Sequence, residues 1–260
     1  MVTSKADHGK TFAKNSAIML TRRVVDILIG FVTIFFIARI LGKEGQGAYS
    51  LIILLPTMLD SFLNLGISPA TIYYTAKRKT EIAEIIRIDI LFSVLLSLAG
   101  IVIGGVILYF LSDRFFKGIP LMLLAMGLAG LPAKMGFTFL GNVFLGIQDY
   151  KTYNFVMIAN RLLFLGILLV LYVFSPVVKS NVIAFVSADV LSLLMVLILV
   201  IRRFNPFKDT SITEYNVKPI LKYGFKSYIN NLLGFLNYRI DMFLVSFFLG
   251  NAAVGLYSIA

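Results

Sequence analysis

The chain has 260 residues, of which 59% are hydrophobic and 14% charged, with a mean hydropathy of +0.91. A soluble domain of this size needs more polar surface, so the composition indicates a membrane protein. The absence of cysteine excludes disulfides and thiolate sites, and the net charge of +11 lies beside apolar runs, which argues against a nucleic-acid partner. The apolar runs lack period-two alternation, which favours an all-α polytopic bundle of transmembrane helices over a barrel.

Seven apolar runs are long enough to cross a bilayer, which takes about 20 residues. A short polar leader precedes the first run, which is too long for the core of a cleaved signal peptide. Within the second run, Pro56 is expected to kink the helix. We expect spans at residues 17–41, 48–75, 88–111, 119–147, 152–174, 181–201 and 223–249, with an eighth beginning near Ala252.

Lysine and arginine are distributed unevenly between the two sides of these spans. Sixteen lie on the side of the N-terminus and five on the opposite side. Because positively charged loops are retained in the cytoplasm, we expect the N-terminus there. The sequence therefore predicts a multi-pass protein of the inner or plasma membrane with a cytoplasmic N-terminus.

A ten-residue phrase occurs twice in the chain. LGKEGQGAYS at residues 41–50 and LGNAAVGLYS at residues 249–258 share the pattern L-G-x4-G-x-Y-S, with an offset of 208 residues. Each copy follows a long apolar run, which indicates an internal repeat. We therefore predict a six-span lobe over residues 1–201, a cytoplasmic linker over 202–222, and the first span of a second, truncated lobe over 223–260. Because six is even, both lobes would have the same orientation.

Several polar and charged residues lie inside the predicted spans, where inserting a charge costs about 2.5–3.5 kcal/mol. Such residues usually face the interior of a bundle or an aqueous cavity. In the first six spans they are Arg22, Arg23, Asp26, Asp60, Asn64, Lys134, Asn160, Arg161 and Asp189. In the seventh span they are Asn230, Asn231, Asn237, Arg239 and Asp241.

Helical spacing places some of these residues on common faces. Those that share a face are Arg22, Asp26 and Thr33 in the first span, and Asn230, Asn237 and Asp241 in the seventh. The offset of 208 relates Asn230 to Arg22 and Asp241 to Thr33. We expect both polar stripes to line one cavity between the lobes.

Other interpretations of the same residues are open. Arg22 and Arg23 lie near the start of their span and can extend to anionic headgroups. Arg22 and Asp26 are four residues apart and can also satisfy each other as an ion pair. Asp189 can serve only to bond neighbouring helices, whereas Lys134, in the middle of its span, is expected to face a cavity or a partner.

A resemblance to a known family rests on two stretches. The end of the first span running into LGKEGQGAYS, and NYRIDMFLVSFFLGNAAVGLYSIA at residues 237–260, resemble the polysaccharide biosynthesis transporters, or O-antigen flippases. These belong to the multidrug/oligosaccharidyl-lipid/polysaccharide exporter superfamily. The resemblance implies two six-helix lobes around a cationic cavity, and movement of undecaprenyl-diphosphate-linked oligosaccharide to the outer leaflet by alternating access. It also makes Arg22 and Arg23 similar to first-span basic residues of related peptidoglycan-lipid flippases, and Arg239 and Asp241 similar to an R-x-D signature.

These considerations predict a transporter with no enzymatic activity and no cofactor, because enzyme motifs are absent. The expected partners are lipid-linked oligosaccharide and membrane lipids, with a second lobe or self-association completing the cavity. Arginine binds phosphate oxygens in pairs, which favours an anionic lipid. The expected substrate-binding residues are Arg22, Arg23, Asp26, Asp60, Asn64, Lys134, Asn230, Asn237, Arg239 and Asp241. The alternatives are a cation-coupled exporter of small molecules or drugs, built around Asp26, Asp60 and Asp241, or an inactive half-transporter fragment.

Overall fold

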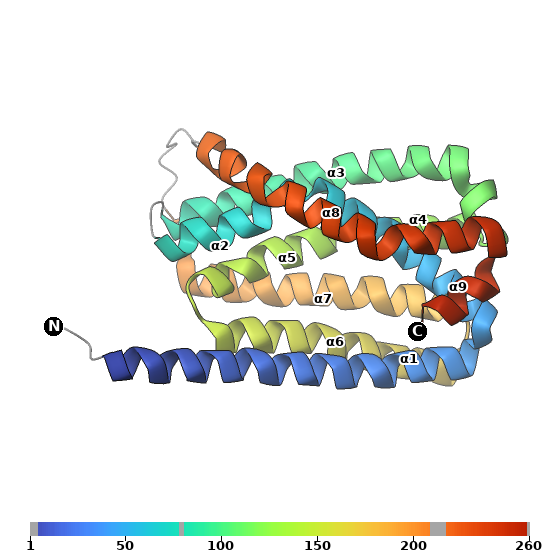
Figure 1. Cartoon of the computed structure of the whole chain (residues 1–260), viewed down its shortest axis with the longest axis horizontal. Coiled ribbons are helices and arrows are strands. Elements are labelled where there is room, and N and C mark those ends of the chain that lie inside the picture. The colour runs from blue at the N-terminus through green and yellow to red at the C-terminus, as the bar shows by residue number, and fades with distance from the viewer. Residues whose placement is uncertain (1–4, 78–80, 209–216, 259–260) are drawn as a thin grey trace.

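The computed structural model describes the backbone of residues 5–77, 81–208 and 217–258, and within these ranges every regular element is a helix. The all-α class predicted from composition is therefore confirmed. Figure 1 shows the helices packed side by side as one bundle. They are α1 Lys5–Leu63, α2 Ile67–Lys77, α3 Ile82–Phe115, α4 Leu121–Ala129, α5 Leu131–Gly146, α6 Tyr150–Phe174, α7 Val178–Phe204, α8 Val217–Leu249 and α9 Asn251–Tyr257.

Helix α1 contains the first predicted span and most of the second, and it changes direction at Gly42. Gly42 has φ 65° and ψ −176°, a conformation that glycine adopts without the steric penalty of a Cβ. The same conformation recurs at Gly250, between α8 and α9, with φ 80° and ψ −178°. The first glycine of each copy of the repeated phrase therefore redirects the chain in the same way.

The second predicted span is interrupted, which differs from the sequence prediction. Helix α1 ends and α2 begins around Leu65 and Gly66, which both have positive φ values. Helices α4 and α5 meet at Gly130, whose φ of −75° and ψ of −13° are helical, so the fourth span continues across this residue. Helix α1 continues through Pro56, so the second span is interrupted at residues 64–66 and not at the proline.

Large hydrophobic side chains are found both in the core and on the outside of the bundle, which indicates that the bundle lies in a membrane. Large side chains such as Phe139 and Phe144 are fully buried between the helices. Phe31, Tyr109 and Val173 are instead among the many large hydrophobic side chains on the outside, as expected of helices that face lipid. Five helices within the described residues are long and apolar enough to cross a membrane, the first of them counted across the bend at Gly42. The chain is a multi-pass membrane protein.

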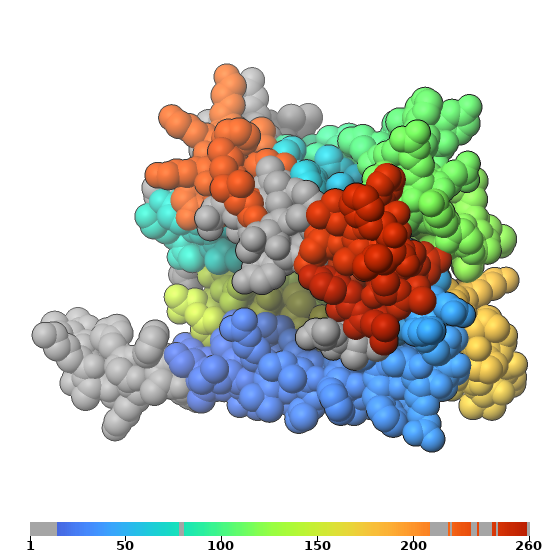
Figure 2. Space-filling view, turned by 45° about the vertical axis from the view of Figure 1, so that its right-hand side comes forward, coloured from blue at the N-terminus to red at the C-terminus, as the bar shows by residue number. Residues whose placement is uncertain are grey.

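The two copies of the repeated phrase meet at one end of the bundle. A Cβ added to Gly47 would lie 1.8 Å from the carbonyl oxygen of Asn251, and one added to Gly255 would lie 1.9 Å from that of Lys43. Residues 47 and 255, like residues 43 and 251, are 208 positions apart, so the two contacts are counterparts. Figure 2 shows the red end of the chain seated against the light-blue part of α1. This reciprocity indicates an approximate two-fold relation between the copies.

At the opposite end, Asp149 joins the start of α6 to the end of α7. Its carboxylate accepts hydrogen bonds from the backbone nitrogen of Thr152 at 3.1 Å and from Oγ1 of Thr152 at 2.9 Å, which caps α6. It also forms an ion pair with Arg203. Partial burial by itself would raise the pKa of Asp149, but the hydrogen bonds from Arg203 and Thr152 together lower it below its ordinary value.

Candidate functional site

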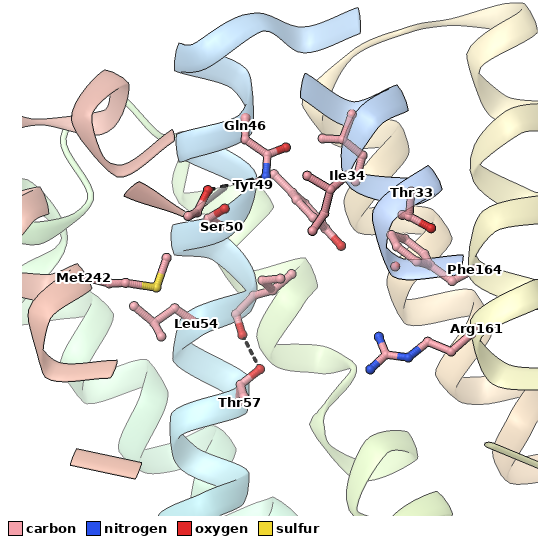
Figure 3. Close-up of a pocket in the computed structure, with 14 residues that line it drawn as sticks. Thr33, Ile34, Gln46, Tyr49, Ser50, Leu54, Thr57, Arg161, Phe164 and Met242 are labelled. Atoms are coloured by element: carbon pink, nitrogen blue, oxygen red, sulfur yellow. Dashed lines mark hydrogen bonds between the residues drawn. The ribbon is translucent and has the colours of Figure 1, made fainter. Parts of the chain in front are cut away.

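A cavity of about 280 Å³, with both apolar and polar side chains in its lining, lies where the two parts of α1 approach α6 and the α8–α9 segment. The bend at Gly42 brings Thr33 from the first part of α1 and Gln46 from the second part to the same cavity. Figure 3 shows these side chains together with Met242 of α8 on the opposite wall. The polar residues that line the cavity are Thr33, Gln46, Tyr49, Ser50, Thr57, Arg161 and Ser258.

Among the described lining residues, Arg161 alone carries a charge. Its guanidinium extends from α6 towards the second part of α1 (Figure 3). It interacts electrostatically with the carboxyl group of Asp189 and the hydroxyl group of Tyr49. Arg161 is a charged residue within a predicted span, but it is not among the residues expected from the sequence to bind substrate. Spacing along a single helix does not reveal which face of that helix lines a cavity.

A polar cluster lies behind the cavity wall, in which Asp189 is buried and Asp60, Lys134 and Asn160 are partly exposed. Nζ of Lys134 lies 3.1 Å from Oγ1 of Thr57, which belongs to the lining. The ammonium group of Lys134 also attracts the carboxylates of Asp60 and Asp189. Nδ2 of Asn160 donates a hydrogen bond to Oδ1 of Asp189 at 3.0 Å. The structure thus brings together two of the predicted site residues, Asp60 and Lys134, in a cluster that contacts the cavity through Thr57.

The basic residues of the first span lie away from this cavity. Nη1 of Arg22 forms an ion pair with Oδ2 of Asp26 at 2.8 Å, so the pairing considered from their spacing is confirmed. The guanidinium of Arg22 also lies over the ring of Tyr153, 5.5 Å from its centroid. Arg23 is exposed. None of Arg22, Arg23 and Asp26 is among the described residues that line the cavity.

Asn64 lies one turn after Asp60, and both line a smaller cavity of about 160 Å³. The amide of Asn64 donates from Nδ2 to Oγ of Ser68 at 2.9 Å and accepts at Oδ1 from the Ser68 backbone nitrogen at 3.2 Å. Asn64 therefore stabilises the first turn of α2 after the interruption at residues 64–66. The other residues that line this cavity are Ser61, Gly66, Ser68 and Tyr228.

The polar face predicted for the seventh span consists of Asn230, Asn237 and Asp241, and among these the structure describes the side chain of Asp241 in α8. Its Oδ1 accepts a hydrogen bond from the backbone nitrogen of Met242 at 2.8 Å, and its Oδ2 accepts one from the hydroxyl of Tyr257. Its neighbour Met242 lines the main cavity, so this part of α8 faces the same space as Thr33. The other predicted residues of α8 have side chains outside the described residues: Asn230, Asn237 and Arg239.

Comparison with known proteins shows which family the chain belongs to. The sequence profile of a family described as polysaccharide biosynthesis protein matches residues 12–260. The chain belongs to this family. This is the family that the resemblance of the two stretches predicted, and the apolar helices make the chain a membrane protein of that family.

A solved structure, described as protein A, shares the fold of this polysaccharide biosynthesis protein. The two superpose with a TM-score of 0.71 at 18% sequence identity. The superposition covers 96% of this chain and 59% of protein A, so the chain spans less than two thirds of that protein. A search of curated proteins gave no match.

Proposed function

We propose that this polysaccharide biosynthesis protein is part of a flippase that moves undecaprenyl-diphosphate-linked oligosaccharide from the inner to the outer leaflet of the cell membrane. The cavity between the helices with the charged Arg161 in its wall is the observation that carries the proposal. The six-span lobe over residues 1–201 supplies one wall. The opposite wall begins with α8 and is completed by a second lobe or by self-association. Alternating access and a cytoplasmic N-terminus are parts of the same proposal.

The chemistry of the cavity favours an anionic, sugar-bearing molecule. The guanidinium of Arg161 stays charged at physiological pH and can donate two hydrogen bonds to a phosphate group. Gln46 and Thr33 supply amide and hydroxyl groups that can bond to sugar hydroxyls. The rings of Tyr49 and Phe164 stack at 6.3 Å with 14° between their planes, which gives the wall a flat apolar surface. A cationic molecule would be repelled by Arg161.

A cation-coupled exporter of small molecules is the second candidate, and it requires an accessible carboxylate in the cavity. Asp26 is paired with Arg22 at 2.8 Å, and Asp241 accepts a hydrogen bond from Tyr257. The described lining of the main cavity contains no carboxylate. We therefore favour the flippase and treat the exporter as an outcome of the test.

The test compares the leaflet distribution of lipid-linked oligosaccharide in cells that have or lack this gene. Membrane-impermeant labelling of intact cells, followed by lipid extraction, measures the fraction of oligosaccharide exposed on the outer leaflet. We expect loss of the gene to leave the oligosaccharide on the inner leaflet and the restored gene to recover outer exposure. An unchanged distribution, with loss of resistance to a cationic drug, would instead establish the exporter.

A further inference from the structure

Another pocket, of about 350 Å³, lies between the start of α3 and the end of α7. Its described lining shares no residue with that of the main cavity. Ile82 and Phe204 supply part of its apolar wall, and Arg87 and Lys208 are the basic residues of its described lining. Glu81 is the one carboxylate among the described lining residues, and it is exposed. A pocket with apolar and basic walls fits a molecule that has an anionic group beside hydrocarbon.

The turn that ends α7 brings Lys208 to this pocket. Asn205 has a positive φ of 42°, which ends the helix at Phe204, and its N–H donates a hydrogen bond to the carbonyl of Ile201 at 3.0 Å. The N–H of Lys208 donates to the carbonyl of Asn205 at 3.1 Å, which closes the turn. Pro206 is buried within this turn and has no N–H with which to continue the helix. Backbone hydrogen bonds thus fix the position of Lys208.

Arg87 approaches the same pocket from α3. It lies in the second turn of that helix and is partly buried. Its Nε donates a hydrogen bond to the carbonyl of Ala83, one turn earlier, at 3.4 Å. Because helical side chains tilt towards the N-terminus of their helix, this bond holds the guanidinium over the first turn of α3. Arg87 and Lys208 therefore reach one pocket from segments that are far apart in the sequence.

The pocket lies at the depth of the lipid headgroups. Leu91 is four residues after Arg87, on the same face of α3, and its apolar side chain is exposed, as expected where the helix faces hydrocarbon. Arg87 lies about 6 Å from Leu91 along the helix axis, and the headgroup region of each leaflet is about 5–8 Å thick. Ile201 in α7 and Phe207 after it are also exposed. Exposed apolar side chains of both segments therefore extend from the pocket into the membrane.

Positive charge exceeds negative charge around the pocket. Arg87 and Lys208 contribute +2 and Glu81 contributes −1, which gives the described lining a formal charge of +1. Arg202, in the last turn of α7, is exposed, whereas its neighbour Arg203 is neutralised by its ion pair at the start of α6. A guanidinium binds phosphate oxygens through two N–H groups, and an ammonium group attracts them as a point charge. Basic pockets between membrane-spanning helices are typical sites for anionic lipid headgroups.

We propose that this pocket binds the headgroup of an anionic phospholipid, with its phosphate on Arg87 and Lys208 and its acyl chains along the exposed apolar side chains of α3 and α7. A soluble phosphate compound would satisfy the two cations but would leave those apolar side chains without a partner. The lipid links the start of α3 to the end of α7, two helices that both pack against α5. It stabilises the bundle, because a ligand that binds only the folded state shifts the unfolding equilibrium. The site does not rest on the proposed function.

Native mass spectrometry of the purified full chain in detergent tests the site, with phosphatidylglycerol as the probe and phosphatidylcholine of the same acyl chains as the comparison. We expect the first phosphatidylglycerol to bind more tightly than phosphatidylcholine and to raise the midpoint of thermal unfolding. Arg87→Gln combined with Lys208→Gln should weaken its binding by about tenfold or more, because two charged hydrogen bonds are lost. The matched control, Arg114→Gln combined with Lys117→Gln, removes two exposed cations near the other end of α3 and should leave the affinity unchanged.

Three results would overturn the proposal. The first is equal affinity of the wild type and the variant at Arg87 and Lys208, or an equal loss in the matched control. The second is equal affinity of the wild type for the two lipids. The third is binding of glycerol 3-phosphate as tight as that of phosphatidylglycerol, which would indicate a site for soluble phosphates. If the double variant fails to fold, Lys208→Gln decides, because Lys208 is exposed: it should weaken binding, and Lys208→Arg should retain it.

Discussion

Replacing Gly47 with alanine should destabilise the contact between the two copies of the repeated phrase. The added Cβ would lie 1.8 Å from the carbonyl oxygen of Asn251 and 2.9 Å from the backbone nitrogen of Gly255. Ordinary contacts begin at 3.4 Å, so α1 and α9 would have to separate by 1.6 Å (3.4 − 1.8). Overpacking costs about 1–3 kcal/mol, and we expect about 3 kcal/mol because backbone atoms cannot rotate away as a side chain can.

Gly105→Ala in α3 is the matched control, because nothing lies within 4 Å of its added Cβ. Alanine there should be neutral or stabilise the helix by up to about 1 kcal/mol. Thermal unfolding of the detergent-solubilised protein, followed by size-exclusion chromatography, compares the two variants. At about 2–4 °C per kcal/mol, Gly47→Ala should lower the midpoint by about 6–12 °C. Equal midpoints for the two variants would refute the close packing of the repeated phrases.

Two further predictions use the same thermal assay. Lys134→Met should destabilise the protein by about 1.5–3 kcal/mol, because the hydrogen bond from the ammonium group to Oγ1 of Thr57 is lost; a wild-type midpoint would contradict that contact. Asp149→Asn should cost about 1 kcal/mol at neutral pH, because the α6 cap and the ion pair with Arg203 weaken. Since folding lowers the pKa of Asp149, its contribution is present above the ordinary aspartate pKa of about 3.9 and is lost as the pH falls through the folded value. A stability difference that did not shrink on acidification would contradict this role.

The class of the protein could be predicted from its sequence, whereas the interruptions of its helices could not. The length of an apolar run reflects directly the thickness of the bilayer it crosses, so the positions of the long helices follow from hydropathy. An interruption inside such a run does not change its hydropathy, which is why the break at residues 64–66 was missed. Pro56 lies inside α1, and the chain breaks where Leu65 and Gly66 adopt positive φ.

The described lining of the main cavity contains none of the ten residues expected to bind substrate, for a related reason. Spacing of four residues sufficed for the ion pair between Arg22 and Asp26, because both partners lie on one helix. Arg161 is also a charged residue within a predicted span. Its place in the cavity lining depends on which face of α6 meets α1, and the sequence does not show this. Gln46 and Tyr49 were recognised only as parts of the repeated phrase. They line the cavity because α1 bends at Gly42, and this bend cannot be predicted from the pattern of apolar residues.

The most direct test of the proposed transport is the leaflet distribution of lipid-linked oligosaccharide in cells that carry Arg161→Gln or Arg114→Gln in the otherwise intact gene. Arg114 is exposed at the end of α3, outside the cavity, and provides a matched loss of one arginine. At equal protein levels, we predict normal outer-leaflet exposure with Arg114→Gln and inner-leaflet accumulation with Arg161→Gln. Normal exposure with Arg161→Gln would contradict the assignment of this cavity to the transported lipid.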